Sequence, residues 1–240
     1  MGWKPIIEVL DFSGFFSGEQ ELFPPETEEK FCFRLHDFRD LDGTMCFCSD
    51  ESAEQIRRRL DPSVASLHWI DTGDYHYLTY FFLERLTEPF TLVLLDNHPD
   101  DQASAFGGDL LSCGGWVRTA SERLPLLRRV VSIGTAVPVE AAAQVLREVV
   151  RGGGAFYLSI DKDVLSEEDA ATNWDQGAMR LPELIESLRL LSQRRRIIGA
   201  DICGGLREPS LKNLRADISI IGTMLDIIQV TNQNQWRKAL

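Results

Sequence analysis

Thr91-Leu92-Val93-Leu94-Leu95-Asp96-Asn97-His98-Pro99-Asp100 is the stretch of sequence that decides the fold. Its first half is an uninterrupted apolar run, which is typical of a strand buried on both faces of a parallel sheet. Its second half places Asp96, His98 and Asp100 at every second position, so an extended backbone projects all three to one side. The stretch therefore indicates a buried strand that ends in a group of possible ligands.

Similar apolar runs alternate with segments of helical length along the rest of the chain. We predict further strands at residues 5–12, 67–70, 130–133, 155–160 and 197–200, and helices at residues 51–60, 77–86, 139–150, 181–191 and 213–228. This alternation indicates βαβ units and an α/β fold, either doubly wound or three-layered, with a mostly parallel central sheet. No repeat or linker divides the chain, so we expect residues 1–240 to form a single domain.

The composition excludes several classes of partner. The chain has 37 Asp and Glu against 25 Lys and Arg, a net charge of −12, which argues against binding to nucleic acid or to an anionic membrane. No apolar run approaches the roughly 18–20 residues that a membrane span needs, and the start does not resemble a signal peptide. Five cysteines at irregular spacing suggest reduced thiols. We therefore expect a cytoplasmic protein.

Acidic residues and histidines follow two more of the predicted strands. Residues 67–70 lead into Asp71-Thr72-Gly73-Asp74-Tyr75-His76, and residues 155–160 lead into Asp161-Lys162-Asp163. Ligand sites in parallel α/β sheets form at the carboxyl ends of the strands, so these groups should meet in one crevice with Asp96, His98 and Asp100. A single Asp after a strand is usually a turn or cap residue, but this interpretation does not account for the whole set.

Carboxylates crowded in this way would repel one another without a cation. A donor set rich in Asp oxygens, with two imidazoles and no thiolate, suits Mn²⁺ better than a structural zinc ion. Six side chains are too many for one ion that also holds water, but they suit two ions about 3.5–4 Å apart with bridging carboxylates. We therefore predict two Mn²⁺ ions per chain.

The three segments together resemble the motifs of the ureohydrolase family of arginases and agmatinases. That family has a Gly-Asp-His segment, an Asp-Ala-His-Ala-Asp segment and a Ser-Phe/Ile-Asp-x-Asp segment in this order, and Ser159-Ile160-Asp161-Lys162-Asp163 is similar to the last of them. The first motif departs from the pattern, because Tyr75 stands where the family has Asp. The resemblance covers roughly residues 68–208 and implies a three-layer α/β/α, arginase-like fold.

The resemblance also implies a ligand set and a reaction. All six family ligands have a counterpart: His76, Asp96, His98, Asp100, Asp161 and Asp163. Asp96 and Asp161 would bridge the ions, with His76 and Asp100 completing one site and His98 and Asp163 the other. In the implied reaction, two Mn²⁺ ions generate hydroxide near neutral pH, which attacks a guanidino carbon so that urea leaves an amine. Family members often form trimers or hexamers, so a homo-oligomer is possible.

Two positions on the substrate side differ from the family pattern. A histidine that is thought to shuttle protons in arginases is replaced by Cys113, which we take as a candidate catalytic residue beside the bridging Asp96 and Asp161. A glutamate that holds the guanidinium is replaced by Gly204, in Asp201-Ile202-Cys203-Gly204. The candidates to bind substrate instead are Asn173, Trp174, Asp175 and Glu208, and Trp174 has a face on which a planar cation can stack.

These departures favour a divergent ureohydrolase over an ordinary free-arginine arginase. One branch of the superfamily acts on arginine within peptides and leaves ornithine, and Gly107-Gly108 and Gly114-Gly115 suggest an open mouth for such a chain. The expected partner is thus a small guanidino compound or an arginine-containing peptide. Two alternatives remain: a metal-dependent deacetylase of the same fold that uses one zinc ion, and a non-catalytic binding module that retains the metals.

Overall fold

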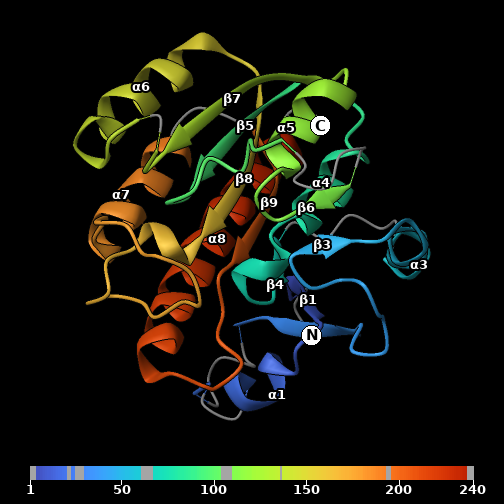
Figure 1. Ribbon diagram of the computed structural model, residues 1–240. Helices are drawn as coiled ribbons and strands as arrows, with labels where there is room; N and C mark the ends of the chain where they lie inside the picture. The colour runs from blue at the N-terminus through green and yellow to red at the C-terminus, as the bar shows by residue number, and fades with distance from the viewer. Residues whose placement is uncertain are drawn as a thin grey trace.

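The computed structural model describes residues 4–20, 23–24, 30–60, 67–103, 110–135, 137–192 and 196–236. Seven strands form one sheet in the order β2-β1-β4-β9-β8-β5-β7, and every neighbouring pair is parallel (Figure 1). The strands are β1 (Ile6–Asp11), β2 (Cys32–Asp37), β4 (Leu67–Ile70), β5 (Phe90–Leu95), β7 (Leu127–Ile133), β8 (Ala155–Asp161) and β9 (Arg196–Cys203). The predicted α/β class and central parallel sheet are confirmed.

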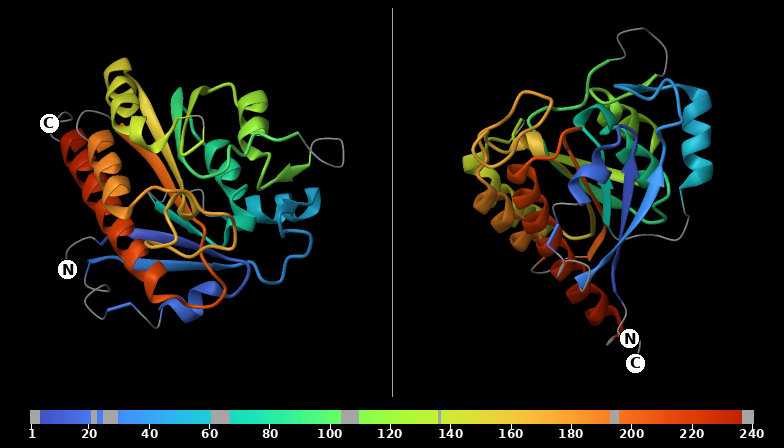
Figure 2. Two further views of the ribbon diagram at one scale, coloured as in Figure 1. Left: turned by 60° about the vertical axis from the view of Figure 1, so that its left-hand side comes forward. Right: turned by 90° about the horizontal axis from the view of Figure 1, so that it is seen from below.

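Helices cover both faces of the sheet and produce three layers (Figure 2). One face packs against α1 (Phe15–Gln20), α6 (Ala142–Gly152), α7 (Leu181–Ser192) and α8 (Leu211–Trp236), and the other against α3 (Asp50–Arg59), α4 (Leu78–Leu83) and α5 (Trp116–Arg123). β3 (Phe47–Cys48) and β6 (Leu111–Ser112) form a separate antiparallel pair. Because both faces are covered, β8 is buried along its whole length, as its apolar sequence indicated.

Three elements of the main layers were not predicted from the sequence: β2, α5 and α1, which has only six residues. β2 is an edge strand whose side chains include Arg34, His36 and Asp37, so it lacks the continuous apolar pattern of the central strands. α5 has only eight residues and follows a Gly-Gly pair, so its helical periodicity is short. No helix in the described part of the chain is both long and apolar enough to cross a membrane.

A buried ion pair joins α8 to the end of β8. Lys162 lies in η3 (Lys162–Val164), directly after β8, and its Nζ donates to both carboxylate oxygens of Asp217 at 2.7 and 2.9 Å. Both side chains are fully buried. Four residues earlier on the same helix, Asn213 bonds the backbone N–H and C=O of Ala171, both at 2.8 Å. α8 therefore holds two of the loops at the carboxyl edge of the sheet.

This geometry predicts the effect of breaking the pair. Lys162→Met should lower the free energy of unfolding by about 3–5 kcal/mol, because it leaves the Asp217 carboxylate buried without its cation. The double variant Lys162→Met/Asp217→Leu should regain most of that loss, since no buried charge remains. Chemical denaturation measures both values, and Arg118→Met, which breaks an exposed pair with Glu122, serves as the control and should cost about 0.5 kcal/mol or less. A double variant as unstable as the single one would contradict this account.

Candidate metal centre

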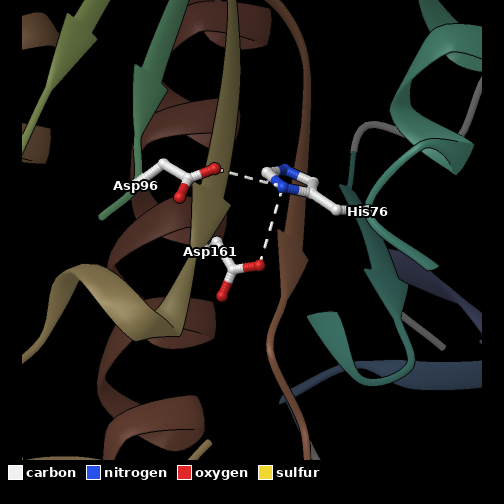
Figure 3. A group of neighbouring side chains, drawn as sticks. All are labelled: His76, Asp96 and Asp161. Atoms are coloured by element: carbon white, nitrogen blue, oxygen red, sulfur yellow. Dashed lines mark ion pairs between the residues drawn. The ribbon is translucent and has the colours of Figure 1, made fainter. Parts of the chain in front are cut away.

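Three strands of the sheet, β4, β8 and β5, bring the predicted ligands to one edge, with β9 between β4 and β8. Asp96 directly follows β5, Asp161 ends β8, and His76 follows η1 (Gly73–Tyr75) after β4. Figure 3 shows the imidazole of His76 pointing toward the carboxylates of Asp96 and Asp161, which come from two other elements. Since parallel strands all end at this edge, residues about 20 to 85 positions apart in the chain become neighbours.

The described residues contain two groups of side chains whose ligand atoms lie within 4.8 Å of one another. One group is His76, Asp96 and Asp161, and the other is Asp96, His98 and Asp163. Asp96 belongs to both groups, which is the position expected of a bridging ligand. Asp161 is part of the first group, and its Oδ1 accepts the backbone N–H of Asp163 at 2.9 Å.

Distances between the side chains show how tightly the centre is packed. The Nδ1 atom of His76 lies 3.2 Å from an Asp96 oxygen, 3.0 Å from an Asp100 oxygen and 3.6 Å from an Asp161 oxygen. The Nδ1 atom of His98 lies 2.7 Å from Asp163. Asp100 reaches the centre with a backbone φ of 47°, a left-handed conformation that Asp tolerates better than most residues. All six predicted ligands therefore meet in one place.

The residues present fit a metal cluster. Oδ2 of Asp96 is buried and has no hydrogen bond of good geometry, with Nδ1 of His76 at 3.2 Å, which is costly for a carboxylate oxygen unless a cation lies against it. The two groups hold three carboxylates, two imidazoles and no thiolate, and Asp100 beside His76 adds a fourth carboxylate. This is a hard, oxygen-rich donor set of the kind that Mn²⁺ and similar ions prefer. The centre therefore suits two divalent ions that share Asp96.

Burial and mutual repulsion perturb the acids of this centre in the metal-free protein. Burial raises the pKa of Asp161 to about 7, and the neighbouring Asp163 charge adds to it. Burial also raises the pKa of Asp96 and of Asp163 to about 6, although hydrogen bonds from His76 and His98 oppose the rise. The hydrogen bond to Asp163 raises the pKa of His98 to about 9. Without metal, the centre therefore holds protons near neutral pH.

His76 is oriented from behind by a chain of buried polar groups. Its Nε2 lies 2.9 Å from Oγ of Ser159, which donates to Asp201 at 2.7 Å, and the Tyr157 hydroxyl donates to the other Asp201 oxygen at 2.8 Å. If Nδ1 binds a metal, Nε2 carries the proton and donates it to Ser159. Burial lowers the pKa of His76, but hydrogen bonds and charge from Asp100 and Asp96 outweigh this and raise it well above its usual value.

A cavity of about 200 Å³ opens over the centre. Besides the six predicted ligands, its wall includes Gln102, Cys113, Gly114 and Trp174. Burial raises the pKa of the Cys113 thiol to about 12, so this thiol keeps its proton at neutral pH. All five cysteines of the chain are free thiols. Gly107 and Gly108, which we expected to widen the mouth of the site, lie outside the described residues.

The predicted substrate residues are placed differently from one another. Trp174 lines the cavity, and its ring lies 5.7 Å from the ring of His98 at 68°. Oδ1 of Asn173 accepts the backbone N–H of Gly73 at 3.2 Å, beside the cavity. The side chains of Asp175 and Glu208 are exposed and are not among those that line it. Asp74 was quoted in a motif but not predicted as a site residue, and it bonds directly to Trp174.

The glycine that replaces the family's glutamate is required by the packing. Gly204 has φ +85°, and a Cβ added there would lie 2.4 Å from Oδ1 of Asp161 and 2.9 Å from the backbone nitrogen of Lys162. The backbone therefore passes directly against a predicted ligand, at a distance that excludes any side chain. An acid that binds substrate must come from another part of the wall.

Comparisons with known proteins agree with the fold. A hypothetical agmatinase from Burkholderia thailandensis superposes with a TM-score of 0.68 and 18% identity, covering 98% of this chain and 87% of that one. The proclavaminate amidino hydrolase of Streptomyces clavuligerus gives a TM-score of 0.69 and 18% identity over 96% and 93% of the two chains. The arginase of Bacillus caldovelox gives 0.66 and 15% over 93% and 98%. The fold is therefore arginase-like, as the resemblance implied.

A closer sequence relative is a protein of Thermotoga maritima that is described as uncharacterized. It is 33% identical over 207 residues, which cover 83% of this chain and 80% of the relative. The chain belongs to the same family as this Thermotoga protein. No family model matches the chain.

The raised pKa values predict how stability depends on pH without metal. Asp96, Asp161, Asp163 and His98 bind protons more tightly in the folded chain than in the unfolded chain. Their contribution to stability is therefore complete below about pH 4, where all of them are protonated in both states, and it is lost as the pH rises through their folded-state pKa values of about 6 to 9. In EDTA, the melting temperature should fall between pH 5 and pH 8.5, and Mn²⁺ should restore it at high pH. Asp161→Asn should flatten the profile in EDTA, and an equally steep profile in that variant would contradict the assignment.

The Ser159 contact predicts a defect in metal binding. Ser159→Ala should weaken Mn²⁺ binding roughly 10- to 100-fold, because His76 loses the group that orients its ring. Calorimetric titration with Mn²⁺ measures this directly. Ser132→Ala is the matched control, since Ser132 lies on the same face of the sheet two strands away and bonds Thr135 rather than a predicted ligand. Equal Mn²⁺ affinities for the two variants would rule out the orienting role of Ser159.

Proposed function

We propose that this protein is a dinuclear manganese-dependent hydrolase that cleaves a guanidino C–N bond and releases urea and an amine. The observation that carries the proposal is the pair of His/Asp groups that share Asp96 at the base of a cavity. The proposed substrate is arginine within a peptide, with an ornithine-type product, or a small arginine-like guanidine. The proposal extends the ureohydrolase fold to an activity, since amidino hydrolysis is the reaction named for a structural neighbour.

Two bound divalent ions would supply Lewis acidity and a hydroxide nucleophile near neutral pH. The protein's contribution begins with the six predicted ligands, which must give up their protons to hold those ions. Ser159 and Asp201 then fix the ring of His76, and the backbone N–H of His98 holds an Asp96 oxygen at 2.6 Å. These contacts keep the ligand side chains in fixed positions. The reacting carbon of the substrate can therefore be held at a defined place over the centre.

The cavity and the charge suit a small cationic group. A cavity volume of about 200 Å³ accommodates the planar end of a guanidine more readily than a large ligand. The acidic centre and the net charge of −12 attract a cation toward it. With its high pKa, Cys113 would contribute a neutral wall rather than a base in this proposal. The predicted cytoplasmic location and homo-oligomer remain part of the same proposal.

Urea release tests the proposed function. The protein loaded with Mn²⁺ should release urea from at least one of free arginine, agmatine and an arginine-containing peptide, with the peptide preferred. Asp161→Asn should reduce the rate at least about 100-fold, since loss of an outer-shell partner alone typically costs 10- to 100-fold. Asp42→Asn, at an exposed position on a surface loop, removes the same charge and should leave the rate unchanged.

Metal analysis separates the alternatives. Two Mn²⁺ per chain with urea release supports the proposal. One zinc ion per chain with deacetylation of an acyl-lysine peptide would replace it by the deacetylase alternative. Bound metals without urea release from any guanidine would leave a binding module.

A further inference from the structure

We propose that Asp74 and Trp174 form the recognition site for the planar cationic group of the substrate. This inference rests on the proposed function. It names an acid that can take the place of the family's glutamate, because the packing at Gly204 leaves no room for a side chain there. The four acids that line the cavity, Asp96, Asp100, Asp161 and Asp163, are all predicted metal ligands. A carboxylate outside the predicted ligand set, next to this wall, is therefore needed to meet a guanidinium.

Asp74 lies on the turn that adjoins the metal centre. The preceding residue, Gly73, lines the cavity, and a Cβ added to it would lie 3.4 Å from Oδ2 of Asp161. Two residues later the same turn carries His76. Asp74 is not itself among the residues that line the cavity, but its carboxylate bonds to Trp174, which is. Asp74 thus stands close to the cavity from a half-buried position.

The carboxylate of Asp74 keeps its charge available. Its Oδ1 accepts the indole N–H of Trp174 at 3.1 Å and the Cys46 thiol at 3.4 Å, and its Oδ2 accepts the Thr72 hydroxyl at 3.4 Å. Within the described ranges, no Lys, Arg or His forms an ion pair with it. Neutral donors therefore orient the carboxylate while leaving its charge, and most of Oδ2, to a cationic ligand.

Trp174 provides the flat surface beside this charge. Its side chain is held from three directions: by Asp74 through Nε1, by the ring of His98 at 5.7 Å, and by Gly73. A Cβ added to Gly73 would lie 2.6 Å from Cδ1 of Trp174, so only glycine allows the indole to approach so closely. The residue remains 40% exposed at the cavity wall. An aromatic face next to a carboxylate suits a guanidinium, which stacks and donates parallel hydrogen bonds.

Two exposed apolar side chains lie next to a residue that contacts Asp74. Met45 is 63% exposed and Phe47 is 38% exposed, and they flank Cys46, whose thiol contacts Asp74. Exposed apolar side chains at this place suit the methylene arm of a side chain rather than a second charged group. The substrate class that fits is therefore a guanidinium at the end of an apolar arm.

Binding of two small probes tests the inference without requiring turnover. Methylguanidinium carries the cation, and methylurea is its neutral analogue of nearly the same shape. Both are titrated calorimetrically into the Mn²⁺-loaded protein. Asp74→Asn keeps an acceptor for the Trp174 indole but removes the charge, so it should weaken methylguanidinium binding roughly 10- to 100-fold and leave methylurea unchanged. Asp42→Asn, with the same loss of charge at an exposed position, should bind both probes as the wild type does.

Two further readouts separate a recognition role from a merely structural one. Asp74→Asn should raise KM for a guanidine substrate while the Mn²⁺ content and kcat stay close to wild type. Trp174→Phe, which keeps a ring but loses the indole N–H, should weaken methylguanidinium binding less than Trp174→Ala does. A structural defect would instead lower Mn²⁺ content and affect both probes equally, and that result would overturn the inference.

The outcome distinguishes this inference from the proposed reaction. Methylguanidinium binding that depends on Asp74, without urea release from any guanidine, would refute the hydrolase and retain the recognition site. Urea release with an unchanged KM in Asp74→Asn would retain the hydrolase and refute the recognition site. Failure of the wild-type protein to bind methylguanidinium would also refute it.

Discussion

Electrostatic repulsion among buried carboxylates is the constraint on which the rest of the structure depends. Four Asp side chains meet at the carboxyl edge of the sheet with exposures of only 1–6%. Like charges so close together in a medium of low polarity destabilise the folded chain unless protons or cations neutralise them. In the metal-free protein, protons neutralise part of this charge, because the pKa values of Asp96, Asp161 and Asp163 are raised. Two divalent ions in the candidate centre would neutralise the same carboxylates without protonating them.

The surrounding layers are arranged to resist this repulsion. On one side, Asp217 of α8 pairs with Lys162, which lies between the predicted ligands Asp161 and Asp163 in the chain. Asn213 of the same helix bonds to the Ala171 backbone. The opposite side contributes the chain from His76 through Ser159 to Asp201. Buried polar networks of this kind stabilise only when every member is satisfied, and both have complete partners. They hold the ligands in place from the two faces of the sheet independently.

The substrate side of the site follows from one close approach of the backbone. A Cβ atom added at position 204 would lie 2.4 Å from Oδ1 of Asp161, so this position can hold only glycine. The residue directly after β9 therefore cannot supply an acid to the cavity. Gly73 of η1 and Trp174 line the cavity, and Asp74, the residue after Gly73, bonds to Trp174. In the recognition site that we propose, the acid therefore lies on η1 rather than at the end of β9.

The sequence by itself determined the class of fold and the predicted ligand set. Strands such as β5 and β8 are buried on both faces, so their apolar runs and the acids behind them are visible without coordinates. Edge strand β2 and helix α5 were missed because local pattern is weak where residues are exposed or the element is short. Asp74 was also missed, although its motif was quoted, because only the contact with Trp174, 100 positions along the chain, distinguishes it from a turn residue.

Tertiary structure decided the order of the strands, the sharing of Asp96 between two groups and the position of Trp174 over the cavity. These features depend on contacts between residues far apart in the chain. Local periodicity reports which side of an element is buried, but it carries no information about which other element lies against that side.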